Sequence, residues 1–281
     1  MFHVDKSSFH RPLSHLLTIV ALLSLAGCQA LTGLFSTYAP TPTFPPFPQP
    51  TPTVTAAPVP TLTPAPPPMI VSRQKQEDNS SPSLYTLKFN YPFLEGVSDP
   101  RFQLFNQEVD KIIARVSQDF KNNLQANDAT PIPNSQGSFQ SVDYSIQYGE
   151  HGLVSVLFNV DLYMAGAAHP NQYFATLNLD IASGKVLALK DIFKPGADYL
   201  KFISGYAIQD LTRQGRLDWE TGAAPNEDNF HSWNITPGGL FFSFDPYQVT
   251  AYAMGPQAVT IPYAAMKDLL DPAGPLTPLF Q

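Results

Sequence analysis

A proline-rich segment without charges limits what this chain can fold into. Residues 40–68 contain thirteen Pro and seven Thr, and no charged side chain occurs from Gln29 to Ser72. Proline removes backbone hydrogen-bond donors and interrupts helices, so such a segment cannot build a hydrophobic core. We therefore expect an extended Pro/Thr-rich stalk over residues 28–72 and a folded domain over residues 73–281, which is long enough for one sizeable core.

The N-terminal residues have the pattern of a secretory signal peptide. Lys6 and Arg11 precede a short apolar run from Leu16 to Leu25, and small residues follow it. The run is too short for a comfortable transmembrane helix, which needs about 20 apolar residues. We predict that residues 1–27 are a signal peptide that is removed on export.

The sequence Leu25-Ala26-Gly27-Cys28 resembles the bacterial lipobox, in which the cysteine becomes the lipidated first residue of the mature protein. The resemblance implies that Cys28, the only cysteine of the chain, holds the protein on the extracytoplasmic face of the cell membrane through its acyl chains. An ordinary signal peptide with a chance cysteine and an uncleaved anchor are the alternatives. Because Gln29 rather than Asp follows the cysteine, we expect delivery to the outer membrane in an organism that has one.

Charge and motif content exclude several classes of protein. After removal of the signal peptide the chain keeps 14 basic and 22 acidic side chains, a net charge of −8, which argues against a nucleic-acid binder. The three remaining histidines, His151, His169 and His231, have no metal-ligand spacing, so no metal site is expected. No phosphate-binding loop or nucleophilic serine motif occurs, and we predict neither a cofactor nor a catalytic residue.

Hydrophobic patterning after residue 84 indicates both strands and helices. Residues 84–91 alternate between apolar and polar side chains, which predicts a strand. Apolar residues from Phe102 to Leu124 recur at spacings of three and four, which predicts a helix with Asp99 as its N-cap. Further strands are expected over residues 138–148, 153–163 and 173–181, and a second helix is expected over residues 196–214.

The order of these elements predicts an α+β fold. A hairpin around Pro237-Gly238-Gly239 and a short strand over residues 258–261 complete the series. Because short turns connect most of the strands, we expect a mainly antiparallel sheet with two principal helices packed on one face. The domain divides into a helix-containing first half, residues 84–165, and a second half, residues 166–281.

An ordered series of short motifs marks the second half. The series consists of Gly166-Ala167-Ala168-His169-Pro170-Asn171, Asn178-Leu179-Asp180, Ser183-Gly184-Lys185, Asp191-Ile192-Phe193, Asp245-Pro246-Tyr247-Gln248 and Val259-Thr260-Ile261-Pro262-Tyr263. It resembles the RsiV-like extracytoplasmic domain, a family of unknown biochemical role that is also found before the catalytic domain of the peptidoglycan deacetylase PdaC. The resemblance covers about residues 84–270, and Ala168 departs from the family's usual glycine.

The resemblance implies a binding module rather than an enzyme. In the anti-sigma factor that gives the family its name, the domain binds lysozyme, so the expected ligand is a lysozyme-like cationic protein or cell-wall glycan (peptidoglycan). The acidic net charge favours the cationic protein, because it would steer such a partner toward the surface. The alternatives are an enzyme that modifies cell-wall glycan, with His169 in proton transfer, and a structural subunit of an envelope complex.

Several side chains of the second half are candidates for contact with a ligand. His169 lies in a turn between two strands. A histidine in such a place could contact a ligand or act as an acid or base, although it commonly fixes its own loop instead. An aspartate in a turn commonly caps backbone N–H groups. The two tryptophans flank a polar, acidic segment. The candidate ligand-binding residues are His169, Asn171, Tyr173, Asp180, Trp219 and Trp233.

The aromatic run from Phe241 to Tyr252 has two interpretations. Aromatic rings on a surface form a platform on which sugar rings stack. Aromatic residues that alternate along a strand, as Phe242 and Phe244 do, are more typical of a hydrophobic core. The pattern favours the core.

Overall fold

The computed structural model describes residues 69–80, 84–96, 99–126 and 137–280, all of which belong to one structural unit. The predicted signal peptide, the lipidated Cys28 and most of the predicted stalk lie outside the described residues. Within these ranges, no helix combines the length and the apolar character that crossing a membrane requires.

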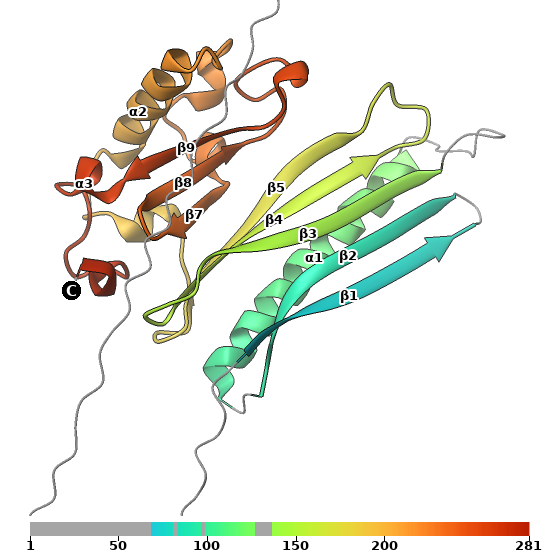
Figure 1. The fold of residues 1–281 in the computed structure, drawn as a ribbon, viewed down its shortest axis with the longest axis horizontal. Coiled ribbons are helices and arrows are strands. Elements are labelled where there is room, and N and C mark those ends of the chain that lie inside the picture. The colour runs from blue at the N-terminus through green and yellow to red at the C-terminus, as the bar shows by residue number, and fades with distance from the viewer. Residues whose placement is uncertain (1–68, 81–83, 97–98, 127–136, 281) are drawn as a thin grey trace, which may run out of the picture. The chain divides into compact units, whose positions relative to one another are not determined.

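Six strands form a sheet whose spatial order follows the chain (Figure 1). Neighbouring strands are antiparallel except for β2 and β3, which are parallel because the long helix α1 carries the chain between them. The strands are β1 (Met69–Asn79), β2 (Tyr85–Glu95), β3 (Ser138–Tyr148), β4 (Leu153–Tyr163), β5 (Asn171–Asp180) and β6 (Lys185–Val186).

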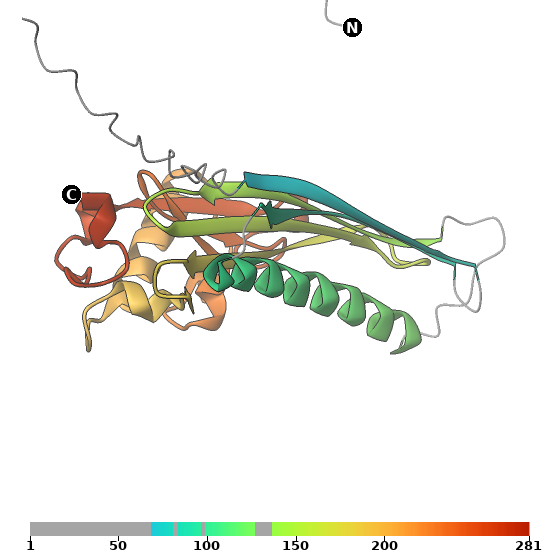
Figure 2. The same cartoon turned by 90° about the horizontal axis from the view of Figure 1, so that it is seen from below.

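The helix α1 (Pro100–Ala126) covers one face of the six-stranded sheet, as Figure 2 shows. The Arg101 guanidinium donates to Asp99 Oδ2 (2.6 Å), and the Arg101 backbone N–H donates to Asp99 Oδ1 (2.9 Å). These hydrogen bonds lower the pKa of Asp99 to about 2. The predicted apolar stripe is buried and packs against alternate residues of the strands, such as Val156 and Phe158 of β4. The buried stripe consists of Phe105, Val109, Ile112, Val116, Phe120 and Leu124.

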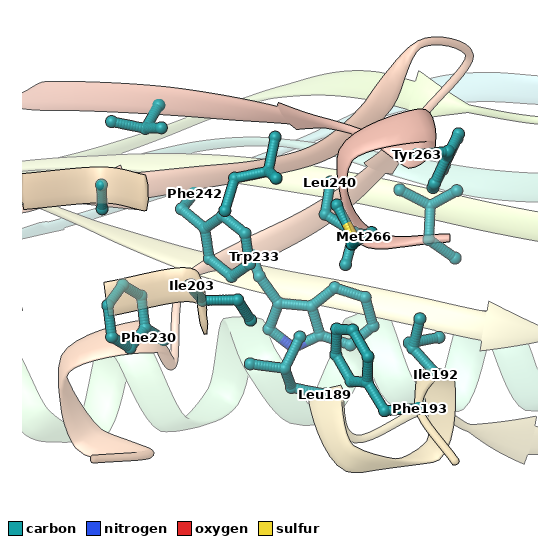
Figure 3. Close-up of a cluster of buried hydrophobic side chains, with 14 of the residues drawn as sticks. Leu189, Ile192, Phe193, Ile203, Phe230, Trp233, Leu240, Phe242, Tyr263 and Met266 are labelled. Carbon is teal, nitrogen blue, oxygen red and sulfur yellow. The ribbon is translucent and has the colours of Figure 1, made fainter. Parts of the chain in front are cut away.

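A second, antiparallel sheet has three strands and its own helix (Figure 1). The helix α2 (Tyr199–Arg213) buries Ile203, Ala207 and Leu211 against it, and the short helix α3 (Tyr263–Met266) follows its last strand. Figure 3 shows the hydrophobic core of this part, in which Trp233 lies among Leu189, Phe193 and Phe242. The strands are β7 (Trp233–Thr236), β8 (Gly239–Phe244) and β9 (Gln257–Pro262).

Buried polar side chains join the two sheets. Ser155 of β4 and Asn178 of β5 are cross-strand neighbours, and the Ser155 hydroxyl donates to Asn178 Oδ1 (2.7 Å). Asn234 Nδ2 of β7 donates to Ser155 Oγ (2.9 Å), and Asn178 Nδ2 donates to the Trp233 carbonyl (2.8 Å). Because Val156 and Phe158 face α1, Ser155 points to the opposite face of the sheet, and β7 packs there.

The structure confirms the α+β class with mainly antiparallel strands and two principal helices. It divides the strands between two sheets, each with one of these helices, where the sequence suggested a single sheet. It also adds β1, which begins at Met69, within the segment predicted as stalk. Most of β1 is exposed and polar, so it lacks the alternation by which strands are recognised in a sequence.

Candidate binding site

The connection between β4 and β5 places His169 at the surface. Gly166 has a φ of 90°, in the region that glycine tolerates best, whereas Ala168 has no positive φ. The alanine at position 168, where the resembled family usually has glycine, therefore fits this loop without strain. The loop ends at Pro170, immediately before β5.

Two tyrosines from the connection between β8 and β9 surround His169. The imidazole stacks on the Tyr252 ring, with 3.9 Å between the ring centroids and 29° between the planes. His169 Nδ1 donates to the Pro170 carbonyl (2.7 Å), and the Tyr252 hydroxyl donates to the same carbonyl (2.7 Å). His169 Nε2 then faces the Tyr247 hydroxyl, 3.4 Å away. We call His169, Tyr247 and Tyr252 the His–Tyr cluster.

Tyr247 adopts a backbone conformation that its residue type rarely takes. Its φ is 68°, and the Gln248 N–H donates to the Asp245 carbonyl (3.0 Å), so residues 245–248 form a turn with Pro246 second and Tyr247 third. A type II turn needs a positive φ at the third position, where glycine is the usual residue. A tyrosine at this position lowers the stability of the fold by about 1–2 kcal/mol through backbone strain. The Tyr247 side chain is 53% exposed, so the hydrophobic core does not need it.

Hydrogen bonds on both sides hold this turn. Asp245 Oδ1 accepts the Phe174 N–H of β5 (3.1 Å), which ties the turn to the six-stranded sheet. Gln248 Nε2 donates to the carbonyls of Gly222 (2.9 Å) and Asn229 (3.0 Å). Strained conformations persist where the surroundings fix them, and they concentrate at functional sites. The turn therefore presents the Tyr247 ring to solvent from a fixed position.

Two aspartates near the cluster are perturbed in opposite directions. Burial raises the pKa of Asp245, although the Phe174 N–H and the nearby His231 partly offset this effect. Hydrogen bonds from the Thr250 hydroxyl (2.6 Å) and the Ala251 N–H (3.1 Å) lower the pKa of Asp218. Folding therefore makes the Asp245 carboxyl a weaker acid than in the unfolded chain, and the Asp218 carboxyl a stronger one.

We expect Asp245→Asn to stabilise the protein at pH 7. Because its pKa is raised, Asp245 binds its proton more tightly in the folded state than in the unfolded state. The stability that this group contributes is therefore present below the ordinary aspartate pKa. It is lost as the pH rises through the raised pKa of the folded state. An asparagine keeps the oxygen that accepts the Phe174 N–H. Urea unfolding should give a higher midpoint for the variant at pH 7 and a smaller difference at pH 3.

Asp218→Asn is the matched control, because its pKa shift has the opposite sign. The Asp218 carboxylate stabilises the folded protein above the ordinary aspartate pKa, and this contribution disappears as the pH falls through its lowered pKa. Asp218→Asn should therefore be less stable than the wild type at pH 7. Equal changes in both variants would contradict this explanation.

The structure separates most of the residues that the sequence suggested as a site. Asn171 is exposed and begins β5, next to the His–Tyr cluster. Tyr173 points toward α1, where burial, with Asp119 nearby, raises the pKa of its hydroxyl to about 12. Asp180 ends β5, about 30 Å from Asn171 at the rise of an extended strand, and accepts hydrogen bonds from the Ser183 N–H and hydroxyl. His169, Tyr173 and Asp180 therefore do not form one site.

The two tryptophans have different environments. Trp219 is 40% exposed, and its backbone N–H donates to the Val249 carbonyl (3.1 Å), so its backbone borders the β8–β9 connection that carries the cluster tyrosines. Trp233 is only 5% exposed and lies in the core of Figure 3. The expectation that Trp233 contacts a ligand is therefore corrected: β7 turns this residue inward, against α2 and β8.

The aromatic run from Phe241 to Tyr252 is divided between the core and the surface. Phe242 and Phe244 are buried in the core, as the strand alternation predicts. Tyr247 and Tyr252 follow the end of β8 and reach the surface. The signal that could have separated them is Pro246, which ends the strand and begins the turn.

A separate hollow of about 850 Å³ contains Asp180 but none of the His–Tyr cluster. Its lining includes Lys190 and Lys194, and a third lysine, Lys185, is paired with Asp191 (Nζ to Oδ1, 2.8 Å). No group of three or more His, Cys, Asp or Glu side chains in the described ranges is placed to hold a metal ion. Among those residues, the hydrogen-bond partners of His169 are a carbonyl and a tyrosine, not a carboxylate that would activate it.

Comparison with solved structures supports the fold. A DUF3298 family member from Bacteroides fragilis superposes with a TM-score of 0.56 at 19% identity, covering 77% of this chain and 98% of that one. A DUF3298 family protein from Pseudomonas aeruginosa gives a TM-score of 0.54 at 12% identity, covering 74% of this chain and 96% of that one. At these identities the likeness concerns the fold alone.

Comparison with curated sequences gives partial matches. The peptidoglycan-N-acetylmuramic acid deacetylase PdaC of Bacillus subtilis is 29% identical over 189 residues, which cover 65% of this chain and 39% of that protein. The immunogenic protein MPT64 of Mycobacterium tuberculosis is 24% identical over 110 residues, or 38% of this chain and 47% of that protein. This chain thus spans less than half the length of these relatives. Its residues 190–264 match the family described as "Protein of unknown function (DUF3298)".

Proposed function

We propose that this chain is an extracytoplasmic, cell-wall-associated binding module that binds wall glycan through the His–Tyr cluster. The similarity to DUF3298 and to a peptidoglycan deacetylase is compatible with a module of this kind. In this proposal, Cys28 carries the lipid that anchors the module to the membrane, on the strength of the lipobox sequence.

The observation that carries the proposal is the strained and exposed Tyr247. Its ring lies 5.4 Å from that of Tyr252, at 29° between the planes, and Tyr252 in turn stacks on His169. A tyrosine presents an apolar ring face together with a hydroxyl, which suits the mixed apolar and polar surface of a sugar. The exposed Trp219 is joined to the same connection by its backbone hydrogen bond to Val249.

A cationic protein of the lysozyme kind is the second candidate ligand. The segment that carries Trp219 also carries Glu220, Glu227 and Asp228, all at the surface, and the chain as a whole is acidic. Acidic groups around an exposed tryptophan would attract a basic protein and give it an apolar contact. Binding of this kind should weaken strongly as the salt concentration rises, whereas stacking on sugars should not.

Tyr247→Gly and Tyr252→Ala are expected to reduce glycan binding about tenfold or more, because each removes one ring of the platform. Tyr247→Gly should also leave the protein at least as stable as the wild type, because glycine accepts the positive φ. Calorimetric titration of the full chain with soluble peptidoglycan fragments and with lysozyme measures affinity, and urea unfolding measures stability. Phe280→Ala removes an exposed ring that contacts Tyr263 and should leave binding unchanged.

The outcomes separate the candidates. Wild-type affinity for glycan in both tyrosine variants would exclude the cluster as the site. Binding to lysozyme alone, lost at high salt and in Glu220→Lys, would establish the second candidate. If the wild type binds neither ligand, the proposed function is wrong.

A further inference from the structure

The strand β1 leaves one edge of the six-stranded sheet open. Among the described residues it pairs only with β2, through eleven consecutive residue pairs from Met69↔Glu95 to Asn79↔Tyr85, without a bulge. Its central residues Gln74, Lys75 and Gln76 are exposed. An edge strand presents unpaired backbone N–H and C=O groups to any further strand, and proline or a bulge often blocks such pairing. β1 contains neither.

The charged residues of β1 change sign along the strand. Arg73 and Lys75 come first along the strand, and Glu77 and Asp78 follow them. A second β1 aligned in parallel would place like charges side by side. An antiparallel copy places the basic residues of each strand beside the acidic residues of the other. The charge pattern therefore complements itself in one orientation only.

One register satisfies this pattern best. When a twofold axis passes through Gln76, Lys75 of each copy lies directly opposite Glu77 of the other, so that two opposite-charge pairs form and no like charges face each other. Axes through Lys75 or Glu77 would place two like charges on the axis itself. Lys75 and Glu77 are two residues apart and share a face of the sheet, as directly opposed cross-strand partners must.

We infer that β1 binds β1 of a second copy of this chain, antiparallel and centred on Gln76, and so joins two six-stranded sheets into one. Glu77 already accepts an ion pair from Lys121 of α1 (2.6 Å) and a hydrogen bond from the Tyr85 hydroxyl (2.7 Å). These contacts hold its carboxylate in place for a second lysine. Because cross-strand ion pairs are individually weak, we expect a reversible dimer that depends on protein concentration.

A cysteine at the axis tests the register. In directly opposed antiparallel residues the Cα atoms are about 4.5–5.5 Å apart, which is within reach of a disulfide. In the full chain with Cys28→Ser, Gln76→Cys should form a disulfide-linked dimer under mild oxidation. Gln74→Cys, exposed on the same face, should not, because its copy lies about 13 Å away in this register. Equal cross-linking of the two variants, or none, would overturn the inference.

A charge reversal tests the pairing itself. Sedimentation of the full chain in mild detergent should show a monomer–dimer equilibrium, which Lys75→Glu shifts toward monomer by tenfold or more. Lys75→Gln should shift it less, because it removes the attraction without adding repulsion. A monomer at all concentrations, or a dimer that Lys75→Glu leaves unchanged, would contradict the inference. Tyr247→Gly should not alter the dimer, so this result is independent of the proposed function.

Discussion

Asn178→Ala is expected to lower the free energy of unfolding by about 3 kcal/mol. The side chain of Asn178 is 2% exposed, accepts hydrogen bonds from the Ser155 hydroxyl (2.7 Å) and the Ile235 N–H (3.2 Å), and donates to the Trp233 carbonyl (2.8 Å). Alanine leaves polar groups of β4 and β7 without these partners in a place that water does not reach. A buried polar group that loses its partner costs about 1–3 kcal/mol.

Urea unfolding of the variant and of Asn122→Ala measures this effect. Asn122 is exposed on α1, and its side chain accepts a single hydrogen bond from Gln118, so its replacement should change stability by less than about 0.5 kcal/mol. A change below about 1 kcal/mol for Asn178→Ala would mean that the network joins the sheets without stabilising them.

The network also bears on the candidate site. It fixes β7 on the six-stranded sheet, and β8, which pairs with β7, leads into the turn that carries Tyr247. His169 comes from the other sheet, 78 residues earlier in the chain. We therefore expect the His–Tyr cluster to loosen when the network is broken, so that Asn178→Ala reduces glycan binding although Asn178 is not part of the cluster.

Elements with a strong local signal could be predicted from the sequence. The stripe from Phe102 to Leu124 became the buried face of α1, and Asp99 lies at its start as expected. The hairpin around Pro237-Gly238-Gly239 became β7 and β8. In each case the residues that determine the structure are neighbours in the chain, so periodicity and turn chemistry are sufficient.

Features that depend on distant contacts could not be predicted in this way. The division into two sheets depends on Ser155, Asn178 and Asn234, which are ordinary polar residues in the sequence and meet only in the fold. Trp233 is buried because β7 packs on two sides, although its sequence neighbours are polar. In the sequence, the tyrosines that contact His169 are recognisable only as members of an aromatic run, because nothing local links Tyr252 to residue 169.

Gly222→Ala is expected to disturb the candidate site and the fold together. A Cβ atom at this position would lie 1.7 Å from the carbonyl oxygen of Gln248, the residue that closes the Tyr247 turn. Backbone atoms cannot yield as a flexible side chain does, so the turn or the 3₁₀ segment Glu220–Ala223 must move. We expect a loss of about 2 kcal/mol or more in the free energy of unfolding, and a loss of glycan binding because the Tyr247 ring is displaced.

Gly205→Ala provides the matched control for this substitution. Gly205 is exposed in the middle of α2, and a Cβ atom there would meet nothing within 4 Å. In the interior of a helix, alanine is more favourable than glycine by about 1 kcal/mol. Gly205→Ala should therefore be more stable than the wild type and should bind glycan normally. Opposite changes in stability for the same chemical substitution would identify the contact with Gln248 as the cause. If Gly222→Ala unfolds like the wild type, the chain can relax around this contact, and the Tyr247 turn is held less firmly than its hydrogen bonds indicate.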